Sequence, residues 1–126
     1  MAQPLLLTYN IEAPVEARLA VLCRGQGIRV RAVKPWEYDL PIGALAGIPM
    51  GKAAAPLTVD AFSDPMLVMC HMLSPQLDAF LQGMRDADIP RVPLKAVLTP
   101  SNITWSSRQL RNELAREHEA FTHRPR

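Results

Sequence analysis

The stretch VPLKAVLTPSN, residues 92–102, joins a strand-like run to a polar turn. Val92–Leu98 places apolar side chains on one face and Lys95 on the other, and Thr99–Asn102 interrupts this alternation. The turn is followed by an amphipathic helical pattern that includes Trp105, Leu110, Leu114, His118 and Phe121. Open α/β domains build ligand sites where a strand ends in a turn that leads into a helix. The stretch therefore predicts an α/β fold and marks the first place to look for a site.

Three further strands and three further helices are predicted. The strand segments are Leu5–Tyr9, Ile28–Val33 and Met66–Cys70. One helix is expected to follow Pro14 and to end at Gly25, and another to run from Ser74 to about Asp86. A short helix capped by Asp39 is expected to extend as far as Ile48. The segment Pro49–Asp64 is expected to be a long excursion over the surface.

The faces of the strands predict their order in the sheet. Leu5–Tyr9 and Met66–Cys70 are apolar on both faces, which is typical of central strands. Ile28–Val33 alternates, and Pro93 cannot donate a ladder hydrogen bond, so the other two strands are expected at the edges. We predict one domain, residues 1–126, with a four-stranded, mostly parallel sheet of order 2-1-3-4 and helices on both faces. The alternative is a ferredoxin-like α+β fold with an added C-terminal helix. No internal repeat is visible beyond the alternation of strands and helices.

Composition limits the classes of function. The net charge of +2, spread along 126 residues, is too small to predict nucleic-acid binding. No apolar run is long enough to span a bilayer, and the opening residues do not resemble a signal peptide, so we expect no membrane association. Cys23 and Cys70 lie in predicted regular elements, which favours free, unreactive thiols in a reducing cytoplasm.

Candidate site residues follow the strands. In a parallel sheet the strand ends would bring together Tyr9, Asn10, His71, Thr99 and Asn102, with Trp105 as either a stacking platform or a buried anchor. Asn102 or Thr104 is expected to cap the last helix. His71 is the best polar candidate, because it follows a central strand.

Catalytic, metal and cofactor signals are weak. Cys70 and His71 are adjacent on a strand and point to opposite faces, so they do not form a dyad. The three histidines share no metal-ligand spacing, and the glycine-rich nucleotide motif, the nucleophile elbow and CxxC are absent. We therefore predict neither a metal nor a cofactor.

The block from Met66 to Phe121 resembles a known family. The resemblance rests most on LKAVLTP (residues 94–100) with Asn102, Trp105, Leu110, Glu113-Leu114 and Glu117-His118. This block is similar to an uncharacterised bacterial domain-of-unknown-function family of the DUF3783 type. The resemblance implies a small bacterial α/β protein with no assigned activity, in which the turn and Trp105 belong to a recurring unit.

Three functional hypotheses remain. The first is a small cytoplasmic α/β binding or regulatory domain that holds a small polar or anionic ligand at the strand ends. The second is a structural or interaction module that forms a homodimer. An enzyme is the third, because motif spacing assembles no acid–base or nucleophile pair.

Overall fold

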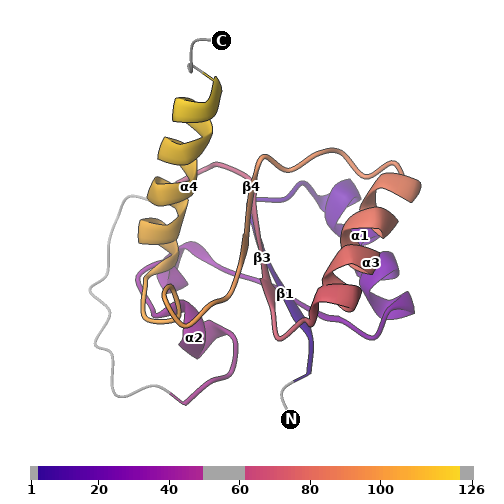
Figure 1. Cartoon of the computed structure of the whole chain (residues 1–126), viewed down its shortest axis with the longest axis horizontal. Coiled ribbons are helices and arrows are strands. Elements are labelled where there is room, and N and C mark those ends of the chain that lie inside the picture. Colours follow the sequence, from indigo (N-terminus) through magenta and orange to yellow (C-terminus); the bar gives the residue numbers. More distant parts are fainter. Residues whose placement is uncertain (1–2, 50–61, 123–126) are drawn as a thin grey trace.

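The computed structural model describes residues 3–49 and 62–122, and its elements follow the predicted order (Figure 1). The chain forms β1 (Leu5–Tyr9), α1 (Ala13–Gly25), β2 (Arg29–Ala32), a 3-10 turn η1 (Pro35–Glu37), α2 (Ile42–Leu45), β3 (Met66–Cys70), α3 (Ser74–Asp86), β4 (Leu94–Val97) and α4 (Ser107–Thr122).

Three predicted details differ from the structure. The short helix is confined to α2, which Pro41 precedes, so Asp39 does not cap it. Helix α4 begins two residues after Trp105, which therefore lies outside the helix. Most of the predicted excursion, residues 50–61, falls outside the described residues, as do the side chain of Phe121 and any contact that it makes.

The strand order is β2-β1-β3-β4, which confirms that β1 and β3 are central. β1 pairs in parallel with β2, and β3 pairs in parallel with β4. The central pair, β1 and β3, is antiparallel, with Leu7 opposite Val68. The sheet is thus mixed, with two of its three pairs parallel. The parallel outer pairs and the helices on both faces rule out the ferredoxin-like alternative.

The positions of Ala46 and Phe62 explain the antiparallel centre. Just after α2, the Ala46 carbonyl oxygen lies 3.0 Å from His71 Nε2, at the end of the sheet where β3 finishes. Phe62 lies at the other end, where its carbonyl oxygen accepts a hydrogen bond of 2.9 Å from Asn10 Nδ2. The chain therefore returns to the end where β1 finishes before β3 begins. Strand β3 must then run opposite to β1.

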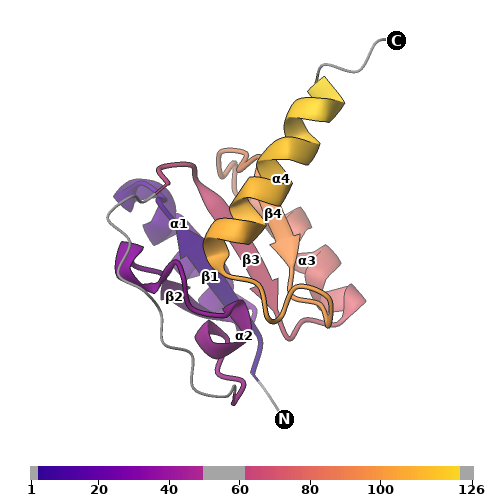
Figure 2. The same cartoon turned by 90° about the vertical axis from the view of Figure 1, so that its left-hand side faces the viewer.

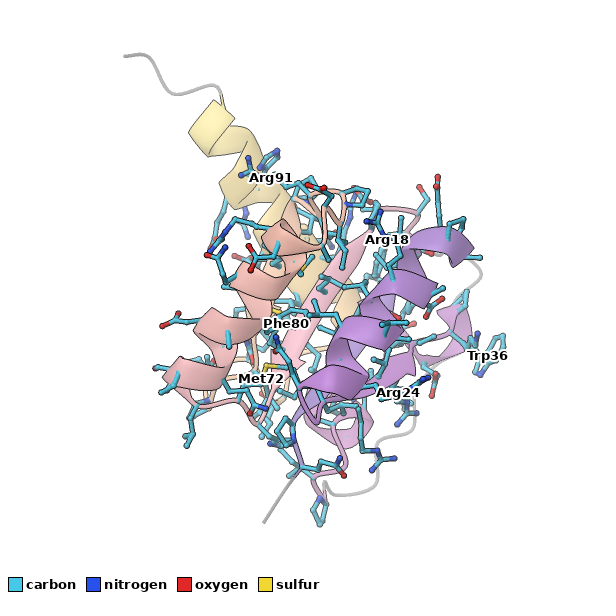
Figure 3. The ribbon with its side chains drawn as sticks, turned by 90° about the vertical axis from the view of Figure 1, so that its right-hand side faces the viewer. Arg18, Arg24, Trp36, Met72, Phe80 and Arg91 are labelled. Carbon is cyan, nitrogen blue, oxygen red and sulfur yellow. The ribbon has the colours of Figure 1, made fainter. Side chains whose placement is uncertain are left out.

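Helices cover both faces of the sheet. α1 and α3 pack side by side on one face, and α2 and α4 lie on the other (Figures 1 and 2). Phe80 is fully buried between α1 and α3 (Figure 3), and Met84 is buried beside it. Leu77 and Leu81 are partly buried against the same cluster, which confirms the predicted core face of α3. The second core, under α2 and α4, includes Leu7, Tyr9, Tyr38, Val68 and Leu110.

The structure contains an internal repeat. Each half is a strand–helix–strand unit followed by a second helix, and the same interval relates the halves: 61 positions separate Leu5 from Met66 and Ala13 from Ser74. Further along each half the interval grows to 65 positions. It separates the start of β2 from the start of β4, and the start of α2 from the start of α4. Pro90–Pro93 accounts for the difference as an insertion in the second half.

Backbone hydrogen bonds repeat with the same intervals. Val33 N–H donates to the Thr8 carbonyl at 2.9 Å, and the equivalent Leu98 N–H donates to Met69 at 2.9 Å. The two halves are related by a pseudo-two-fold axis. Across this axis Gly43 N–H donates to the Ile103 carbonyl, and the equivalent Arg108 N–H donates to the Tyr38 carbonyl. Asn10 (φ 56°) and His71 (φ 59°), which are equivalent positions, are both left-handed.

The prediction that the chain has no internal repeat is therefore wrong. Few residues are identical between the halves; the pairs Pro14/Pro75, Arg24/Arg85 and Ile28/Ile89 are among them. The halves share the pattern of apolar positions and turns, which many unrelated strand–helix units also share.

Helices α1 and α3 are in close contact at Gly83. A Cβ atom there would lie 2.6 Å from Leu22 Cδ1. Leu22 and Gly83 are equivalent positions of the two halves, so the large and the small residue meet at the pseudo-two-fold axis.

We expect Gly83→Leu to lower the free energy of unfolding by about 1–3 kcal/mol, because the new side chain must displace Leu22. Leu22→Ala should also destabilise the protein. The double variant should lose less free energy of unfolding than the two single variants lose together. Urea denaturation of the four proteins measures this coupling. Additive losses would show that the two positions are not in contact.

Candidate functional site

The structure separates the predicted site residues into two groups. Because β1 and β3 are antiparallel, Tyr9 and Asn10 lie at one end of the sheet and His71 and Thr99 at the other. The expectation that all of them line one site is therefore wrong. It assumed a parallel central pair.

Tyr9 belongs to the core. Its side chain is fully buried, and its hydroxyl oxygen lies 2.7 Å from Ser107 Oγ. Its ring lies 5.7 Å from that of Tyr38, which in turn stacks on Phe62 with ring centroids 4.3 Å apart. Burial raises the pKa of the Tyr9 hydroxyl well above its usual value. Tyr9 therefore anchors α4 to the sheet.

Asn10 fastens the chain that leads into β3. Its Nδ2 group donates to the carbonyl oxygens of Phe62, at 2.9 Å, and Asp64, at 3.1 Å. Its Oδ1 atom accepts a hydrogen bond of 3.2 Å from the Tyr38 hydroxyl. The amide group of Asn10 is therefore engaged in structural contacts.

A groove of about 770 Å³ lies at the other end of the sheet, where β3 and β4 finish. His71 and Thr99 border it, together with Gln76 of α3. The rest of the lining is apolar and comes from five segments of the chain: Pro4, Ile48, Met72, Leu73, Val97, Leu98, Pro100 and Ile103.

Polar groups lie along the groove. His71 is partly buried, and its Nε2–H donates to the Ala46 carbonyl at 3.0 Å, which leaves Nδ1 as an acceptor. Helix α3 begins beside the groove without a side-chain cap. The Ser74 and Gln76 amides of its first turn therefore present N–H groups and the positive end of the helix dipole.

Asn102 shapes the turn that borders the groove. Its Oδ1 atom accepts from Thr99 N–H at 2.9 Å, and its Nδ2 group donates to the Val97 carbonyl at 3.0 Å. The prediction that Asn102 or Thr104 caps α4 is wrong, because α4 begins at Ser107. Ser106 caps it instead, since its Oγ atom accepts a hydrogen bond of 3.1 Å from Gln109 N–H.

Trp105 has a structural position. Its side chain is partly buried against the core under α2 and α4, and its carbonyl oxygen accepts a hydrogen bond of 2.8 Å from Ile42 N–H. These contacts favour the buried anchor over the stacking platform.

Most of the groove left no signal in the sequence, because its walls are apolar and come from distant segments. One signal was present. Met72 and Leu73 follow His71 at a strand-to-helix turn, where polar residues are usual, and Leu73 is 80% exposed.

In the part of the chain that the structure describes, no group of three or more His, Cys, Asp or Glu residues could hold a metal ion. His118 is exposed on α4. None of the described helices is both long and apolar enough to cross a membrane.

Replacing Asn102 with alanine should lower the free energy of unfolding by about 1–3 kcal/mol, because it leaves Thr99 N–H and the Val97 carbonyl without their partner. Thermal and urea denaturation measure the loss. The matched control is Thr104→Ala at an exposed position of the same turn, which should change stability by less than about 0.5 kcal/mol. Equal effects of the two substitutions would contradict the structural role of Asn102.

Cys23 and Cys70 are buried free thiols, and burial raises their pKa values to about 11 and about 12. We expect neither to react with a thiol reagent in native buffer at neutral pH, whereas both should react in denaturant. The stabilisation from burying the neutral thiols is fully present below pH 9 and is lost as the pH rises toward 11 and 12. Rapid labelling of Cys70 in the native protein would contradict its burial.

No curated protein and no solved structure gives a significant match to this chain. Residues 65–121 match the model of a family described as a domain of unknown function (DUF3783), in agreement with the resemblance seen in the sequence. The stretch that folds into β3, α3, β4 and most of α4 is thus the part of the chain that matches DUF3783, a domain whose function is unknown.

Proposed function

We propose that this protein is a small binding domain and that its site is the groove at the ends of β3 and β4. Its ligand would be a small molecule with an apolar body and one polar or anionic end. The observation that carries the proposal is the groove itself, an apolar trough of about 770 Å³ beside an uncapped helix N-terminus.

The chemistry of the groove favours such a ligand. The walls would gain free energy by removing apolar surface from water, at roughly 25 cal/mol per Å² buried. Two further groups would orient the polar end: His71 Nδ1 can accept a hydrogen bond, and the Ser74 amide can donate one.

Binding accounts for the groove better than catalysis does. The residues that line it include no carboxylate and no thiol, and His71 is the one side chain among them suited to general acid–base work. A reducing compartment such as the cytoplasm would suit the protein, since Cys23 and Cys70 are both free thiols.

A homodimer is the second candidate, and Leu73 favours it. Leu73 is 80% exposed and continues the apolar lining of the groove, and a contiguous exposed apolar patch marks many protein-interaction surfaces. Light scattering after size exclusion measures the mass in solution. A dimeric mass for the wild type and a monomeric mass for Leu73→Ser would establish this second function.

Titration with hexanoate and with 1-hexanol, followed through backbone amide chemical shifts, tests the ligand site. We expect saturable shifts at His71, Gln76 and Thr99, with hexanoate bound more tightly because its carboxylate can meet the α3 amides. Leu73→Ser should lower the affinity for both ligands several-fold.

The matched control is Val21→Ser, which removes an exposed apolar side chain from α1, away from the groove. It should leave both affinities unchanged. Shifts that do not saturate, or that spread evenly over the protein, would refute the proposed site.

A further inference from the structure

The four-residue insertion Pro90–Pro93 breaks the internal repeat and contributes to a second hollow. This hollow, of about 380 Å³, lies beyond the C-terminal part of α3, at the end of the sheet opposite the groove. Figure 3 shows Arg91 in this region. We propose that the hollow binds a small organic phosphate, with the phosphate on its basic side chains and the organic part on its apolar floor.

The floor of the hollow is apolar. It consists of Leu81 and Met84 of α3 with Ile89 and Val92 of the following segment. Met84, Ile89 and Val92 are at most 7% exposed, so the floor belongs to the packed core and has a fixed shape.

Three cations surround this floor: Arg85, Arg91 and Lys95. Lys95 is partly buried, and its Nζ group donates to the Val92 carbonyl at 2.7 Å. Burial lowers the pKa of the Lys95 amine, and the charge of Arg91 lowers it further. The positive charges of Lys95 and Arg91 therefore repel each other at the hollow, and a bound anion would relieve this repulsion.

Acidic side chains do not neutralise these cations. Among the described residues, the ion pairs are formed by Arg31, Arg108, Arg111 and Arg116. Asp86 accepts a hydrogen bond of 2.8 Å from Gln82, and neither Asp86 nor Asp88 lines the hollow. A phosphate dianion fits three cations better than a single carboxylate does, because it carries more negative charge and has three terminal oxygens that accept hydrogen bonds instead of two.

The first half of the molecule supports this inference by comparison. Arg24 of α1 occupies the position equivalent to Arg85, but Val30 stands where the second half has Lys95. The first half also lacks any counterpart of Arg91, which belongs to the insertion. The basic hollow is therefore a feature of the second half alone.

Isothermal titration of the full chain with phenyl phosphate, inorganic phosphate and benzoate tests the proposal. We expect saturable binding of phenyl phosphate, at least fivefold tighter than inorganic phosphate and tighter than benzoate. Lys95→Met and Arg91→Gln should each lower the affinity for phenyl phosphate at least tenfold. Binding should raise the pKa of Lys95, which NMR of its side chain follows directly.

Arg24→Gln is the matched control, because it removes an exposed arginine from the equivalent position of the first half. It should leave the affinity within twofold of wild type, and Lys95→Arg should retain most of the binding. Thermal melts check that each variant folds. The proposal is overturned if phenyl phosphate does not saturate, if benzoate binds more tightly, or if Arg24→Gln weakens binding as much as Arg91→Gln.

Discussion

The antiparallel pairing of β1 with β3 is the constraint on which the rest of the structure depends. Leu7 lies opposite Val68, and these equivalent residues place the pseudo-two-fold axis at the centre of the sheet. Each parallel outer strand and each helix is positioned by its own half. The axis then fixes the second half relative to the first. The same pairing sends the C-terminal ends of β1 and β3 to opposite ends of the molecule, so Tyr9 and Asn10 lie far from His71. The groove and the basic hollow are separated within the second half, because they lie at opposite ends of α3.

Sequence patterns predicted the elements and their order because those follow from local chemistry. The apolar faces of β1 and β3, and the alternation in Ile28–Val33, report burial directly. The direction of β3 depended on where the chain enters it, at Phe62 and Asp64 beside Asn10, and no local pattern encodes that position. The site prediction failed for the same reason: with the direction of β3 reversed, Tyr9 and Asn10 moved away from His71. Thr99 and His71 remained together because both belong to the second half.

The groove and the hollow would bind their ligands through different interactions. The groove is mainly apolar, and its specificity would come from one ring nitrogen of His71 and the amides at the start of α3. The hollow concentrates positive charge over an apolar floor through Arg85, Arg91 and Lys95. Both belong largely to the second half, the part that matches the family of unknown function. The first half supplies the other side of the sheet, and its Asn10 and Tyr9 hold the connection and α4 in place.

The contact between Leu22 and Gly83 also determines which units can associate. Two copies of the first half, joined through the same axis, would bring Leu22 against Leu22 in a space that accepts one such side chain. Two copies of the second half would bring glycine against glycine and leave a void between the helices. Only the unlike pair fills the space. The halves are therefore complementary at this contact, although they share one order of strands and helices, and a single chain that contains both halves keeps each beside its partner.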